Sequence, residues 1–164
     1  MIPNRPLSIL FVCLGNICRS PLAEAILRHR LTETHMNANV YIDSAGTGDW
    51  HTGRSADGRS ISVARRNGIT LDSNARQVIP EDFHIFDYIL AMDRQNQQDL
   101  EALKVLHGGK AIIKLFLEFD IADKSVLDVP DPYYGGTEGF QHLFQMLDKT
   151  CLLIINQLVD KTMP

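Results

Sequence analysis

The chain has 164 residues, 45% of them hydrophobic and 22% charged, proportions typical of one globular domain and not of a disordered chain. Its net charge of −4 argues against a nucleic-acid partner held by bulk charge. Three cysteines are too few for a disulfide-framed secreted domain. Because the sequence has no bilayer-length apolar run and no signal-peptide pattern at its start, we expect a cytoplasmic protein with reduced thiols and no membrane span.

Predicted strands and helices alternate along the chain. Residues 7–13 are a nearly continuous apolar run, typical of a strand buried on both faces. Ser20-Pro21 is typical of a helix start, with Ser20 as the N-cap, and this helix is expected to end in the low thirties. The other predicted elements are a strand over 39–44, a helix over 56–67, a strand over 86–92, a helix over 94–106, a strand over 111–116 and a last helix whose apolar stripe runs from 140 to 158.

This alternation predicts an α/β fold, with a mostly parallel sheet and helices on both of its faces. In such sheets, ligands bind beyond the carboxyl ends of the strands. Cys13 lies at one such end, and the turns after Ser44 and Met92 lie at two others. We therefore expect the functional site to form around Cys13.

The loop from Cys13 to Ser20, CLGNICRS, has the composition of an anion site. A short loop that leads into a helix can direct several backbone N–H groups at one centre, and Gly15 permits the backbone shape that this needs. Arg19 offers a planar fork for two phosphate oxygens. Cys13 in the same positive field is expected to be a thiolate, positioned for in-line attack on phosphorus. The alternative is a buried thiol at a strand end beside a surface arginine.

Asp131 is the candidate acid that such a reaction needs to protonate the departing oxygen. It lies between Pro130 and Pro132, which stiffen the segment and favour an extended backbone. Tyr133 and Tyr134 follow and are expected to exclude water. Considered alone, the segment is more typical of an ordinary Asp-Pro turn before a helix.

These residues together resemble the low molecular weight protein tyrosine phosphatases. The loop 13–20 matches the family's phosphate loop at every position, and the resemblance extends over residues 7–160. Supporting matches are Asp43-Ser44-Ala45-Gly46-Thr47, Ala75-Arg76-Gln77, Ala91-Met92-Asp93 and Asp131-Pro132-Tyr133-Tyr134.

The resemblance implies a single domain over 1–164 with a four-stranded parallel sheet, and hydrolysis of phosphotyrosine in proteins and of small aryl phosphates. It implies Cys13 as nucleophile, Arg19 as phosphate clamp and Asp131 as general acid and then base, without a metal or organic cofactor. The remaining implied site residues fall into three groups: phosphate binding by Leu14, Gly15, Asn16, Ile17, Cys18 and Arg19; support of the loop by Asn16, Ser20, Ser44 and Asp93; and a substrate slot of Trp50, Tyr133 and Tyr134.

The two other cysteines and one difference from the family's sequence pattern add to what the resemblance implies. The resemblance implies that Cys18 forms a protective disulfide with Cys13 under oxidation, whereas Cys151, on the apolar stripe of the last helix, is expected in the core. Animal members of the family carry a histidine where this chain has Ser73. The loop-supporting network is therefore expected to be altered there.

Other functions remain open on the sequence alone. Arsenate reduction uses a similar scaffold but needs relay cysteines, and Cys151 is the only downstream cysteine. Capture of phosphotyrosine or phosphate without turnover is a second alternative. The physiological partner is expected to be a phosphotyrosine protein, possibly a tyrosine kinase, and the enzyme a monomer or a weak dimer.

Overall fold

The computed structural model describes residues 5–120 and 122–163. Its centre is a four-stranded parallel sheet in the order β2-β1-β3-β4, made of β1 (Leu7–Cys13), β2 (Val40–Gly46), β3 (Tyr88–Ala91) and β4 (Ile112–Leu115). The chain passes from β1 to β2 on one side and then crosses from β2 to β3 on the other side of β1, so a crevice opens beyond the carboxyl ends of β1 and β3. This confirms the predicted α/β class and places Cys13, the last residue of β1, at that crevice.

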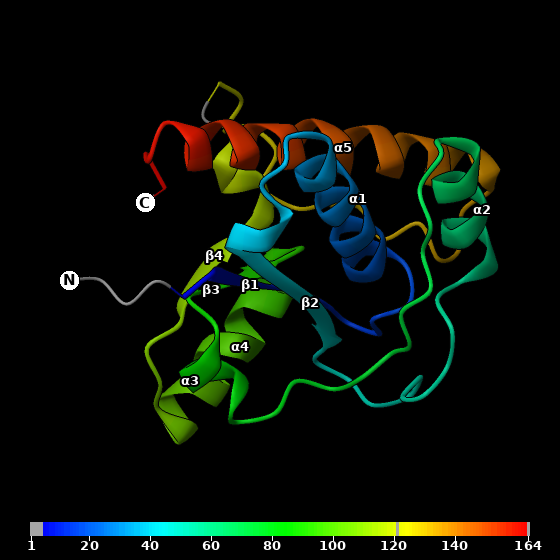
Figure 1. Cartoon of the computed structure of the whole chain (residues 1–164). Coiled ribbons are helices and arrows are strands. Elements are labelled where there is room, and N and C mark those ends of the chain that lie inside the picture. The colour runs from blue at the N-terminus through cyan, green and yellow to red at the C-terminus, as the bar shows by residue number, and fades with distance from the viewer. Residues whose placement is uncertain (1–4, 121, 164) are drawn as a thin grey trace.

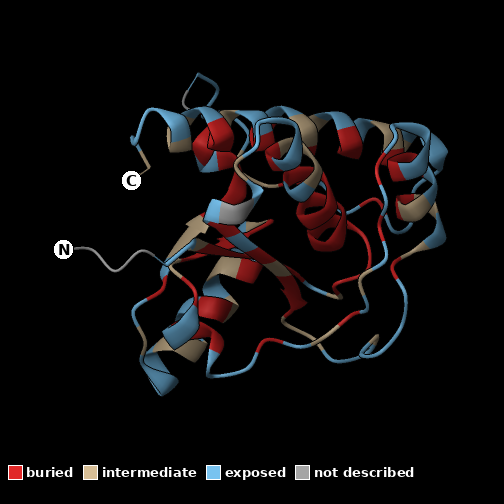
Figure 2. Cartoon of the chain, viewed as in Figure 1, coloured by how far each residue is buried: buried red, intermediate tan, exposed pale blue. Residues whose placement is uncertain are grey.

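Helices cover both faces of the sheet (Figure 1). On one face lie α1 (Arg19–Glu33), α2 (Gly58–Arg66) and α5 (Thr137–Val159), and on the other lie α3 (Asp82–Ile85) and α4 (Arg94–His107). Alternate residues of β1 supply the two cores: Ile9 and Phe11 pack toward α1 and α5, whereas Leu10 and Val12 pack toward α4. Figure 2 shows the resulting buried centre, with exposed residues on the outer faces of the helices. Burial on both faces explains the nearly continuous apolar sequence of β1.

Several predicted boundaries shift. The helix after the loop begins at Arg19, not after Ser20, so Ser20 is not an N-cap; its hydroxyl turns toward Cys13 instead. β2 extends to Gly46, two residues beyond the predicted end, because it stays paired with β1 as far as Cys13. Gly46 approaches the loop so closely that a Cβ atom there would lie 2.8 Å from the Leu14 carbonyl oxygen. The pattern analysis missed three short elements, α3 and the 3₁₀ helices Asn37–Asn39 and Phe116–Phe119.

Candidate active site

The loop between β1 and α1 directs its backbone N–H groups inward. Four of its carbonyl groups accept hydrogen bonds from donors outside the loop, and in a trans peptide unit the N–H points opposite to the C=O. The amides of Leu14, Gly15, Cys18 and Arg19 therefore point toward the centre of the loop. The bonds, of 2.8–3.2 Å, join Cys13 to Thr47, Leu14 to Gly48, Ile17 to Asp57 and Cys18 to Ser60.

Cys13 lies at the bottom of this loop and is 3% exposed. Its Sγ accepts a hydrogen bond from the Asn16 backbone N–H at 3.3 Å and lies 3.0 Å from the Ser20 hydroxyl oxygen. Ser20 is fully buried in the first turn of α1. The sulfur is thus held by one backbone donor and lies within hydrogen-bond reach of one hydroxyl.

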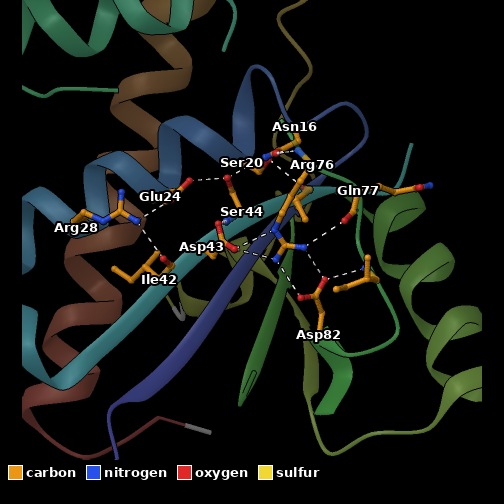
Figure 3. Close-up of polar contacts among 12 residues, drawn as sticks. Asn16, Ser20, Glu24, Arg28, Ile42, Asp43, Ser44, Arg76, Gln77 and Asp82 are labelled. Atoms are coloured by element: carbon orange, nitrogen blue, oxygen red, sulfur yellow. Dashed lines mark hydrogen bonds and ion pairs between the residues drawn. The ribbon is translucent and has the colours of Figure 1, made fainter. Parts of the chain in front are cut away.

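Asn16 is held in a left-handed conformation, with φ at 55°. Its side-chain amide donates to the hydroxyls of Ser20 at 2.8 Å and Ser44 at 3.0 Å, while its Oδ1 accepts the Arg76 backbone N–H at 3.0 Å (Figure 3). These three bonds offset the cost of the strained backbone. The expected supporting residues Asn16, Ser20 and Ser44 therefore form one contiguous group.

The group ends in a buried carboxylate that the sequence analysis did not single out. Ser44 donates to Glu24 Oε2 at 2.6 Å, and Arg28 donates to Glu24 Oε1 at 2.7 Å (Figure 3). Among residues 5–120 and 122–163, the side chain of Ser73, the departure noted in the sequence, forms no hydrogen bond to this group, which Glu24 and Arg28 extend instead. The sequence spacing could have pointed to Glu24, because it follows Ser20 by one helical turn and so lies on the same face of the helix.

Arg19 is 3% exposed, and two hydrogen bonds hold its guanidinium group in place. Its guanidinium donates to Asp93 Oδ2 at 2.7 Å and to the Val129 carbonyl at 3.0 Å. Asp93 also caps α4 by accepting a hydrogen bond from the Asn96 backbone N–H at 2.8 Å. One oxygen of Asp93 thus binds Arg19 while the other is held by the start of α4. Burial disfavours the charged guanidinium, but Cys13, Asp93 and Asp131 together hold its pKa above the ordinary value.

Asp131 reaches the same site from a loop 112 residues away in sequence from Arg19. Its Oδ2 lies 3.7 Å from an Arg19 guanidinium nitrogen, and its Oδ1 accepts the Tyr133 backbone N–H at 3.1 Å. Arg59 braces this loop by donating to the carbonyl oxygens of Tyr133 at 2.9 Å and Gly135 at 3.1 Å. Sequence reasoning missed Arg59, because its partners are distant in the chain.

Cys13, Arg19 and Asp131 line one cavity of about 330 Å³. Its floor is the loop and its rim is aromatic, with Trp50 66% and Tyr134 96% exposed. His51, which was not predicted, also lines it and packs over Gly15. The full lining is Cys13, Leu14, Gly15, Ile17, Cys18, Arg19, Trp50, His51, Asp131, Tyr133 and Tyr134.

The two other cysteines are buried thiols. Burial and the nearby Asp57, Cys13 and Asp131 raise the pKa of Cys18 to about 12, although Arg59 opposes the shift. Cys151 is fully buried in α5, as expected, and burial raises its pKa well above the ordinary value. Across the described residues, no cluster of His, Cys, Asp and Glu is placed to hold a metal ion. None of the helices in that part of the chain is long and apolar enough to cross a membrane.

The buried thiol, the inward-facing amides, the arginine and the carboxylate at the rim are groups that a cysteine-dependent phosphatase requires. Comparison with known proteins agrees. The sequence model of the low molecular weight phosphotyrosine protein phosphatases matches residues 8–163, and the chain belongs to this family of protein-tyrosine phosphatases.

Individual relatives match over nearly their full length. The low molecular weight phosphotyrosine protein phosphatase of Sus scrofa is 40% identical over 152 residues, 92% of this chain and 95% of the relative. YfkJ of Bacillus subtilis, a low molecular weight protein-tyrosine-phosphatase, is 42% identical over 148 residues, 88% of this chain and 91% of the relative. In the structural comparison, the crystal structure of YfkJ has a TM-score of 0.88 at 37% identity and covers 98% of this chain and 99% of its own.

Proposed function

We propose that the protein hydrolyses phosphotyrosine through a phosphocysteine intermediate on Cys13. The observation that carries the proposal is that the Cys13 thiol, the Arg19 guanidinium and the Asp131 carboxyl line one cavity of about 330 Å³. A nucleophile, an anion clamp and a proton donor at one place are what phosphoryl transfer to an enzyme requires.

In the first step, the Cys13 thiolate attacks phosphorus as the bond to the tyrosine oxygen breaks. The inward amides and Arg19 hold the non-bridging oxygens and stabilise the charge that develops on them. Asp131, in its protonated form, gives its proton to the departing oxygen. The products are S-phosphocysteine, a free tyrosine hydroxyl and an ionised Asp131.

In the second step, Asp131 accepts a proton from water as the water oxygen attacks phosphorus. The sulfur–phosphorus bond breaks, and the Cys13 thiolate leaves with inorganic phosphate as the other product. The Ser20 hydroxyl, 3.0 Å from Sγ, is placed to donate to this thiolate. Ser20, Asn16 and Ser44 thus act as positioning residues.

The rim supports an aromatic phosphate ester as substrate. Trp50 and Tyr133 both line the cavity, whose floor holds the buried sulfur of Cys13. A phenyl ring fits between such walls, while the shorter phosphoserine would not reach Cys13. The protein partner is a phosphotyrosine protein, such as a tyrosine kinase.

Cys18 is proposed to protect the nucleophile. Both thiols line the cavity, so peroxide oxidation of Cys13 to a sulfenic acid, followed by attack of Cys18 on that sulfur with loss of water, yields a disulfide. Reduction by a cellular dithiol restores both thiols. A reducing compartment, the cytoplasm, suits this chemistry.

Four purified proteins test the reaction: the parent, Cys13→Ser, Asp131→Ala and, as an exposed carboxylate control, Asp123→Ala. Aryl phosphates of different leaving groups are assayed with a thiol reductant and no metal. We expect Cys13→Ser to be inactive and Asp131→Ala to be slowed about a hundredfold for poor leaving groups, with Asp123→Ala unchanged. Phosphate binding by an inert, folded parent would instead indicate capture without turnover.

A further inference from the structure

A second hollow of about 460 Å³ adjoins the phosphate cavity. It shares Leu14 and Trp50 with that cavity, so one wall separates the two. We name it the α4 groove. Its lining is Leu14, Thr47, Gly48, Trp50, Asp99, Ala102, Leu103 and Leu106.

One face of α4 forms the far side of the groove. Asp99, Ala102, Leu103 and Leu106 follow the spacing of three, four and seven residues that places side chains on one face of a helix. Leu106 is 75% exposed. Leu106, Trp50 and Leu14 are therefore exposed apolar side chains in one hollow beside the catalytic loop, and such contiguous patches mark binding surfaces.

The groove also carries an unneutralised negative charge. Asp99 accepts a hydrogen bond from Gln95 at 3.0 Å, and in residues 5–120 and 122–163 it forms no ion pair. A groove that combines a carboxylate with apolar side chains is complementary to a ligand that carries a cation next to an apolar side chain.

We propose that the α4 groove binds the residues of the protein substrate that flank its phosphotyrosine, and that it selects an apolar residue followed by Lys or Arg. This inference rests on the proposed function. With the phosphotyrosine ring against Trp50, the substrate backbone leaves the cavity over its rim, and on the Trp50 side the groove begins at once.

Binding tests the groove without requiring turnover. The variant Cys13→Ser retains the cavity, and Trp50 is the sole tryptophan, so its fluorescence reports occupancy. Three phosphotyrosyl peptides are compared: one with Leu-Arg before the phosphotyrosine, one with Leu-Arg after it, and one with Ser on both sides. We expect one of the Leu-Arg peptides to bind about tenfold more tightly than the Ser peptide.

Leu106→Gln and Val105→Gln, each added to Cys13→Ser, form a matched pair. Val105 is a neighbouring α4 residue, 87% exposed, that does not line the groove. Leu106→Gln and Asp99→Asn should each remove most of the Leu-Arg preference, and Val105→Gln should leave it. Equal affinity for all three peptides, or equal effects of the two Gln substitutions, would overturn the proposal.

A separate assay keeps the two proposals apart. In the otherwise unaltered enzyme, Leu106→Gln should leave hydrolysis of a small aryl phosphate unchanged and lower kcat/KM about tenfold for the preferred peptide. A parent that fails on aryl phosphate contradicts the proposed reaction. A peptide preference that is absent from the Cys13→Ser variant contradicts the groove.

Discussion

The buried carboxylate of Glu24 joins the solvent-facing Arg28 to the hydroxyl of Ser44, and through it to the loop around Cys13. Glu24 is 4% exposed, whereas the Arg28 side chain is 51% exposed. An ionised carboxylate at this depth needs its partners, because an unpaired buried charge is costly. The network behind the nucleophile thus depends on an ion pair that starts at the surface.

Arg28→Met tests that dependence. Methionine keeps the apolar stem but removes the donors to Glu24 and to the Ile42 carbonyl. We expect the free energy of unfolding to fall by about 2 kcal/mol and kcat to fall several-fold, as measured by urea unfolding and aryl phosphate turnover. Arg66→Met, an exposed arginine on α2, is the control. Identical behaviour of the two variants would show that the Glu24 pair does not support the loop.

Arg59→Met tests whether Arg59 positions the general acid. The substitution removes the donors to Tyr133 and Gly135 but keeps much of the packing on the Phe140 ring, 4.5 Å from the guanidinium carbon. We expect a fall of about tenfold in kcat for poor leaving groups and a smaller fall for good ones, since a displaced acid matters only where a proton is needed. Arg65→Met, exposed on the same helix, should show neither effect. A fall independent of the leaving group would exclude this role.

The raised pKa of the Cys18 thiol predicts that the folded protein loses stability at alkaline pH. Its pKa is about 12 in the folded protein, compared with an ordinary value of 9.0. Above pH 9.0 the unfolded chain therefore binds fewer protons than the folded one, and unfolding becomes more favourable as pH rises toward 12. One thiol contributes at most about 1.4 kcal/mol per pH unit. Urea unfolding of the parent and Cys18→Ser at about pH 8 and about pH 10.5 measures the difference, and parallel pH dependences would contradict it.

Thr47→Val should stabilise the protein. The hydroxyl oxygen of Thr47 is buried and, among the described residues, has no hydrogen-bond partner. Valine has the same shape without the polar group, so we expect the free energy of unfolding to rise by about 1 kcal/mol. Urea unfolding of the parent, Thr47→Val and Thr47→Ala separates this effect from packing. A loss for Thr47→Val as large as that for Thr47→Ala would show that the hydroxyl is not orphaned.

Local patterns predicted the parts of the site that lie close together in sequence. The apolar strand, Gly15 and Arg19 are adjacent in the chain, so the loop could be recognised before the structure. Glu24 with Ser44, and Arg59 with Tyr133, are long-range pairs that only the packed fold brings together. The ion pair of Arg76 with Asp43 is of the same kind (Figure 3). The predicted start of the first helix was wrong at Ser20. Serine is a common N-cap residue, but here its hydroxyl contacts the Cys13 thiol instead of capping the helix.

The most direct test of the account is to trap the phosphocysteine. With an aryl phosphate whose leaving group needs no proton, Asp131→Ala should complete the first step and stall at the second, which needs the base. Acid quenching and peptide mass spectrometry should then find one phosphoryl group on Cys13. A peptide that carries no phosphoryl group while phosphate is released at the parent's rate, or a phosphoryl group on another residue, would contradict the mechanism.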